Sequence, residues 1–176
     1  MANFPQLDDQ VGVWKLKEVN NAVSGGYWRN AGTKGIYGGS YTGPAAGTVI
    51  DQIILATAGN ATDFGDLSVG RGKSGGLGSF TRCIFVGGQT PSDSSVIDYI
   101  SFASTGNAAD FGNILAAGYG MGCTSSSTRG IISGGDAPGI QNVIRYIEMA
   151  STGNATDFGD LTQARRLPAS AGSPVR

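Results

Sequence analysis

Carboxylates are the first candidates for acid or base chemistry in this chain, because the sequence contains no histidine. The usual general base and the commonest zinc ligand are therefore missing. Asp51 and Asp98 hold corresponding places in a recurring Val-Ile-Asp segment, and paired carboxylates can hydrolyse a glycosidic bond. The third copy of the segment carries Arg145 there instead. We therefore interpret these aspartates as solvent-facing hydrogen-bond partners and expect no enzyme, with a polysaccharide hydrolase as the less favoured alternative.

A recurring phrase rich in oxygen donors invites comparison with a calcium site. Asn60, Asp63 and Asp66 are spaced donors, but the phrase lacks the acidic density and terminal glutamate of an EF-hand loop. A later copy also replaces the last aspartate with Asn113. We predict that these side chains cap turns through hydrogen bonds to the backbone, and we expect neither a metal nor another cofactor.

Two cysteines and several tyrosines complete the candidate side chains. Cys83 and Cys123 occupy different places in the pattern, which favours two small apolar residues over a disulfide, although a disulfide is possible. Tyrosines can stack on sugars, and also pack at the rim of a core. The tyrosines considered for a glycan site are Tyr41, Tyr99, Tyr119 and Tyr146.

These residues are positioned by a sequence repeat with a period of 47 residues. The phrase Gly-Asn-Ala-Thr-Asp-Phe-Gly-Asp-Leu begins at Gly59 and again at Gly153, and a close variant begins at Gly106. Such a period indicates one supersecondary unit copied in tandem and packed against its neighbours. The residues predicted to form the repeated core are Ile50, Ile97, Ile144, Phe64, Phe111 and Phe158.

Each copy is predicted to be built from short β-strands. A basic residue leads an apolar run into a glycine pair, as in 82–88 and 129–135, and an alternating run follows at 49–54, 96–101 and 143–148. Alternation is typical of a strand with one wet face, and the Gly-Asn turn after it predicts a hairpin whose return arm holds the phenylalanine. About four strands fit in one copy, as in a propeller blade.

The predicted fold is therefore all-β, with three tandem four-stranded repeats near 34–81, 82–128 and 129–176. The glycine pair, alternating strand and later aromatic residue resemble a kelch-type β-propeller blade, with phenylalanine in place of that repeat's usual tryptophan. Arg176 stands one period after Arg129, and the first copy lacks the Gly/Ser-rich strand that precedes the later ones. We expect at least one terminal strand to pair outside its own hairpin, with the other terminus or with another subunit, giving for example six blades from two chains.

Residues 1–33 differ in composition from the repeats. Leu16, Val19 and Val23 lie on one face of a predicted short helix that Gly25-Gly26 would end, with Trp14 and Trp28 at its flanks. This segment is expected either to cap the repeats or to dock on a neighbouring subunit.

Charge and composition exclude some partners. The 12 Lys and Arg residues against 13 Asp and Glu give no basic field for nucleic acid or anionic membrane. No apolar run is long enough to span a bilayer, and the first residues lack the pattern of a secretory signal. We expect a soluble protein made in a cytoplasm.

The opening Gly12-Val13-Trp14-Lys15-Leu16, the Gly25-Gly26-Tyr27-Trp28 segment and the recurring Gly-Asn-Ala-Thr-Asp-Phe-Gly-Asp-Leu phrase together resemble structural proteins of tailed bacteriophages, especially marine and cyanobacterial phages. The resemblance spans nearly the whole chain. It implies a non-catalytic virion component of the tail, nozzle, fibre or capsid surface, made in the host cytoplasm, whose partners are itself and other virion proteins. A module that adsorbs to a host glycan or receptor is the alternative.

Overall fold

The computed structural model describes residues 34–42 and 45–172, and these residues form antiparallel β-sheets without a helix. The all-β prediction is confirmed for this part of the chain. The predicted helix within 13–23, with the docking candidates Trp14, Leu16, Val19, Val23 and Trp28, lies outside the described residues. The described sheets belong to one compact unit of the chain.

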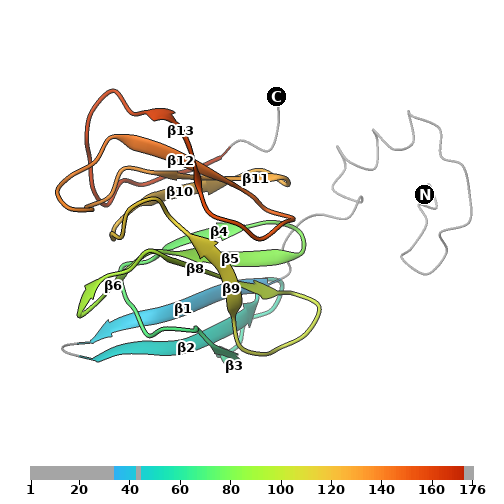
Figure 1. Ribbon diagram of the computed structural model, residues 1–176. Helices are drawn as coiled ribbons and strands as arrows, with labels where there is room; N and C mark the ends of the chain where they lie inside the picture. The colour runs from blue at the N-terminus through green and yellow to red at the C-terminus, as the bar shows by residue number, and fades with distance from the viewer. Residues whose placement is uncertain (1–33, 43–44, 173–176) are drawn as a thin grey trace, which may run out of the picture. The chain divides into compact units, whose positions relative to one another are not determined.

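Three sheets follow one another along the chain, and Figure 1 shows them from blue-cyan through green to orange-red. The first sheet has the order β1-β2-β3, from Lys34–Thr42, Ala45–Ile54 and Thr62–Asp66. The second has the order β4-β5-β8-β9, from Gly75–Gly78, Arg82–Val86, Val96–Ser101 and Ala109–Asn113. The third has the order β10-β11-β12-β13, from Gly122–Ser125, Arg129–Ser133, Val143–Glu148 and Thr156–Asp160. A small hairpin joins β6 (Gln89–Thr90) to β7 (Ser92–Asp93) between β5 and β8.

The strands of the second and third sheets correspond at the period of the sequence. Tyr37 pairs with Asp51, Phe85 with Asp98 and Ile132 with Arg145, so the register is the same in all three sheets. Each return arm also carries a bulge, in which its phenylalanine is the extra residue opposite the second and third residues of the alternating run. The predicted hairpin and its return arm are therefore confirmed in all three copies.

Glycine is required where each apolar strand ends. Gly87 and Gly88 have φ angles of 57° and 116°, and the corresponding Gly134 and Gly135 have 62° and 96°. These left-handed conformations cost little only for glycine, so the pair ends the strand and turns the chain. The first copy has a single such residue, Gly39, with φ of 75°.

The sheets stack face to face, and the core lies between them. One apolar cluster joins the first and second sheets, and a larger one joins the second and third. The expected pairing between the two ends of the chain is absent from the described residues: β1 pairs with β2, and 161–172 contain no strand. That expectation was wrong within one chain because residues 167–172 instead lie beside β10, where Ser170 and Pro168 approach Gly122. Pairing with another subunit stays a prediction.

Candidate functional site: the two outer faces of the sheet stack

The contact between the first and second sheets, here called the first junction, contains the aromatic residue of the repeated phrase. Phe64 and Leu67 of the first copy pack with Phe85 and Ile100 of the second. The ring of Phe85 fits because Gly38 opposite has no side chain, and a Cβ there would lie 2.6 Å from a ring carbon. Residues of β2 and β3 that point toward the second sheet are thus buried by it.

A backbone connection accompanies this packing. The amide of Gly106 donates to the carbonyl oxygen of Phe64 at 2.8 Å, and the amide of Ala108 donates to that of Asp66 at 2.8 Å. Between them, the side-chain oxygen of Asn107 accepts the Asp66 amide at 3.0 Å. The Gly-Asn-Ala turn of one sheet therefore binds the outermost strand of the sheet before it.

The contact between the second and third sheets, the second junction, repeats the same connection. The amide of Gly153 donates to the carbonyl oxygen of Phe111 at 2.7 Å, and the amide of Ala155 donates to that of Asn113 at 2.8 Å. The Asn154 side chain accepts the Asn113 amide at 2.9 Å. This recurrence makes the turn and strand a defined docking pair, because the same groups meet in the same order at both junctions.

The first junction also encloses an ion pair. Arg71 Nη2 lies 3.0 Å from Asp98 Oδ2, and both side chains are 0% exposed. The Ser68 hydroxyl donates to the other carboxylate oxygen at 2.7 Å. Burial lowers the pKa of the Arg71 guanidinium from its usual value, while the charge and hydrogen bond of Asp98 oppose that change. The interpretation of Asp98 as solvent-facing was wrong, because the arginine that neutralises it lies in the connection before β4, a region that the alternating pattern does not reach.

At the second junction the same positions carry different residues. Gly118 and Arg145 stand where Arg71 and Asp98 stand at the first junction. A side chain at Gly118 would collide with Ala137. Arg145, on β12 of the third sheet, is buried, with only 3% of its surface exposed. Burial lowers the pKa of Arg145, and the nearby Asp157 opposes this. Its Nε and Nη1 atoms have no hydrogen-bond partner in the described part of the chain.

Arg71 and Arg145 were not identified as buried residues from the sequence, although the residue types at positions 71 and 98, and at 118 and 145, change together. Arginine at 71 accompanies aspartate at 98, and glycine at 118 accompanies arginine at 145. Such an exchange between two positions indicates that their side chains share one space.

On the outer face of the third sheet, the residues that correspond to buried residues of the two junctions are more exposed. Phe64 and Phe111 are 3% and 2% exposed, but Phe158 is 54% exposed. Ile50 and Ile97 are fully buried, whereas Ile144 is half-buried. The prediction of a core position was therefore confirmed for the first two copies and was wrong for Phe158, since no later sheet covers it within the described residues. Phe158 contacts Tyr146 edge to face, with 6.0 Å between ring centroids, as the buried Phe111 contacts Tyr99 at 5.9 Å.

The outer face of the first sheet carries the residues that correspond to the other side of a junction. Tyr37 is 60% exposed, although Phe85 and Ile132 at the corresponding places of the later sheets are buried. Leu55 is also exposed, whereas the corresponding Met149 is buried. Asp51 is half-buried and forms no ion pair with another described residue.

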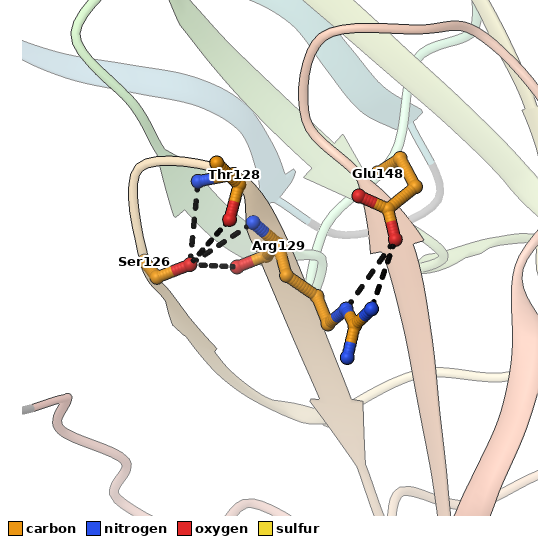
Figure 2. A network of polar contacts seen from close by, with 4 residues as sticks. All are labelled: Ser126, Thr128, Arg129 and Glu148. Carbon is orange, nitrogen blue, oxygen red and sulfur yellow. Dashed lines mark hydrogen bonds and ion pairs between the residues drawn. The ribbon is translucent and has the colours of Figure 1, made fainter.

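The arginine that begins β11 in the third sheet also differs from its counterpart in the second sheet. Arg82 reaches across the second junction, where its Nη1 atom donates to the Met149 carbonyl at 3.4 Å. Figure 2 shows that the corresponding Arg129 instead reaches Glu148 on β12, at 3.2 Å from its Nη2 atom. Both side chains of this ion pair are about half exposed, so it contributes at most about 1 kcal/mol to stability.

The remaining candidates have local roles. Asp63 accepts the Gly65 amide at 3.1 Å, as expected of a group that caps a turn. Asp66 instead accepts the Thr48 side-chain hydroxyl at 2.7 Å, a bond to another strand and not to the backbone. Cys83 and Cys123 are free, and burial raises the pKa of each thiol to about 12.

The four tyrosines do not form one cluster. Lys73 lies over the rings of Tyr41 and Tyr119, 4.4 and 4.7 Å from their centroids. Tyr99 and Tyr146 lie under Arg82 and Arg129, with 4.6 and 4.7 Å between guanidinium carbon and ring centroid. Only the first pair is brought together, and Tyr41 is exposed.

Within the ranges that the structure describes, no three acidic, cysteine or histidine side chains gather as metal ligands. The same residues contain no helix long and apolar enough to cross a membrane. No protein-family model matches the chain, and no curated protein matches it significantly.

Proposed function

We propose that this chain is a non-catalytic structural component of a tailed-bacteriophage particle, assembled from propeller-like, kelch-like blades that bind copies of themselves and other virion proteins. Three antiparallel sheets, one of three strands and two of four, follow one another along the chain and support the blade interpretation. The proposed localisation is the virion, after synthesis in the host cytoplasm, as the resemblance of the repeated phrase implies. The position on the particle, whether tail, nozzle, fibre or capsid surface, is left open.

The single observation that carries the assembly role is the exposure of Phe158. The same residue type is almost fully buried in the two preceding copies by the sheet that follows. A phenylalanine exposed over half its surface, beside a half-buried Ile144 and Leu161, is an apolar surface of the kind that marks a protein contact. A structural protein that polymerises or docks on a neighbour requires such a surface.

The virion role is tested by locating the chain in particles of the phage that encodes it. Purified particles, washed at high salt, are analysed by mass spectrometry and labelled with gold-conjugated antibody for electron microscopy. We expect a stoichiometric amount of the chain at one site on each particle. If it occurs only in the infected-cell lysate and never with particles, the proposal is wrong.

A binding module is the second candidate, and one arrangement favours it. Exposed Tyr41 and half-buried Tyr119 flank the Lys73 ammonium, which also donates to Gln89 at 2.8 Å. Aromatic rings beside hydrogen-bonding groups are suited to a sugar. Retention of the purified chain on host envelopes, lost in Tyr41→Ala but kept in the control Tyr37→Ala, would favour adsorption over a purely structural role.

A hydrolase is the least supported of the three. Asp98 is held by Arg71 and Ser68 in a fully buried ion pair, and a general acid or base must reach its substrate. Release of reducing sugar from host polysaccharide, abolished in Asp51→Asn, would overturn this order.

A further inference from the structure

The two outer faces carry complementary halves of one junction. On the third sheet, Phe158 and Asp160 correspond to Phe64 and Asp66, whose carbonyls accept hydrogen bonds at the first junction. On the first sheet, Gly59-Asn60-Ala61 has the same sequence as the turn Gly106-Asn107-Ala108 that supplies those donors. In the described residues neither half has the partner that its internal counterparts have.

The buried charges of the first junction are also divided between these faces. Arg165 and Thr162 of the third sheet correspond to Arg71 and Ser68, and Asp51 of the first sheet corresponds to Asp98. Arg165 is exposed, and no ion pair joins it or Asp51 to another described residue. A guanidinium and a hydroxyl on one face thus match a carboxylate on the other, in the arrangement that forms the internal ion pair.

We infer that the outer face of the third sheet binds the outer face of the first sheet of a second copy of this chain, in the register of the first junction, with Arg165 and Thr162 of one copy holding Asp51 of the next. This inference deepens the self-assembly part of the proposed function and rests on it. Other occupants lack a reason to match both the Gly-Asn-Ala turn and the charge pattern at once. Because the two faces differ, the contact is head to tail, and it produces a closed ring or an open filament.

The apolar side chains fit the same arrangement. Phe158 and Leu161 would take the places that Phe64 and Leu67 have at the first junction, against Tyr37 and Ile53 of the next copy in the places of Phe85 and Ile100. Covering Phe158 in this way removes the largest exposed aromatic side chain of the third sheet from water.

The test exchanges the two charges in the full chain and measures assembly mass by sedimentation velocity. We expect the unaltered chain to form a defined oligomer or filament. Asp51→Arg and Arg165→Asp should each weaken association by at least roughly a hundredfold in Kd, because like charges then meet in the contact. The double variant, and an equimolar mixture of the two single variants, should associate again because each then contains an opposite-charge contact. Asp110→Arg, the same charge change on exposed β9, is the matched control and should assemble as the unaltered chain does.

Three results would overturn the inference. The first is an unaltered chain that stays monomeric at about 100 µM, which is about tenfold above the Kd of a weak specific contact of about 10 µM. The second is unchanged association of both single variants. The third is a double variant that folds but stays monomeric. The first is also the result expected if residues 1–33 of the same chain cover the face. The virion role is judged separately: a monomeric chain found at one site on particles overturns this contact alone, and an oligomer absent from particles overturns the proposed function alone.

Discussion

The first and second junctions join similar sheets through the same backbone bonds, but the charged residues buried in them differ. At the first junction Arg71 and Asp98 neutralise each other in a space closed to water. At the second junction Gly118 provides no side chain, and the buried Arg145 forms no ion pair with a carboxylate of the described residues. The phenylalanine and the Gly-Asn-Ala turn are present at both junctions.

This difference separates what the junction requires from what it tolerates. The carbonyls of Phe64 and Phe111 accept the amides of Gly106 and Gly153 at nearly the same distance. The turn glycine approaches so closely that a side chain at Gly65 or Gly112 would collide with it. Backbone bonding and the aromatic side chain are therefore common to both contacts, whereas the buried charged residues differ between them.

Removing the carboxylate of the first junction should have the largest effect. In Asp98→Ala the buried Arg71 guanidinium loses its counter-charge, and we expect the free energy of unfolding to fall by about 3 to 5 kcal/mol. Urea denaturation followed by circular dichroism measures this. Asp110→Ala, at an exposed carboxylate of β9, should change it by less than about 0.5 kcal/mol. Equal effects of the two variants would show that the ion pair does not form.

Truncating the repeated phenylalanine in the second junction, and on the outer face of the third sheet, compares a covered face with an uncovered one. Phe111→Ala empties a site in the second junction and should destabilise the fold by about 3 to 4 kcal/mol, whereas Phe158→Ala should cost about 1 kcal/mol or less in the monomer. The measurement is urea denaturation in dilute solution. A large loss in Phe158→Ala under these conditions would mean that the residue is buried within its own chain.

Replacing the unpartnered arginine should make the second junction more stable. Arg145→Met keeps an unbranched side chain of similar length and removes two buried nitrogen donors that have no acceptor, so we expect a gain of about 1 to 3 kcal/mol. Thermal unfolding by calorimetry provides the readout, and Arg129→Met at the half-exposed ion pair is the control with an expected change under about 1 kcal/mol. A loss in Arg145→Met would indicate an acceptor for its Nε or Nη1 atom.

The smallest expected effect concerns the thiols, one at each junction. Burial raises the thiol pKa of Cys83 and Cys123 from 9.0 to about 12. At pH 8 the folded chain should therefore react with a disulfide reagent roughly a thousandfold more slowly than the urea-unfolded chain. Because a raised pKa favours the protonated thiol in the folded state, its contribution to stability is present below pH 9 and is lost as pH rises from about 9 to about 12. Cys83→Ala/Cys123→Ala should flatten that decline, and fast labelling at pH 8 would contradict the burial.

The repeated phrase predicted the strands well because their patterns are local. The alternation around Ile97 and the turn at Gly106 fix a hairpin without reference to any other copy. Burial could not be predicted in the same way. Phe111 and Phe158 have nearly identical neighbours in sequence, and their exposure differs because one is followed by a further sheet.

The candidate site depended still more on distant residues. Asp98 is neutralised by an arginine 27 positions earlier, so its own strand pattern could not reveal its burial. Compensating changes between positions 71 and 98, and between 118 and 145, were available as a signal of contact. The described residues also show consecutive sheets meeting through their faces, whereas sequence reasoning considered strand edges.

Within the described residues, the Gly-Asn-Ala turns that begin at Gly106 and Gly153 are each bonded to the sheet immediately before them. Cooperativity therefore passes along the stack one neighbour at a time, as in a linear series of coupled elements. The middle sheet is supported from two sides and each terminal sheet from one, so opening should start at the extremities and proceed inward. Amide exchange should accordingly be slower at Gly106 and Gly153, whose N–H groups donate across a junction, than at Gly59.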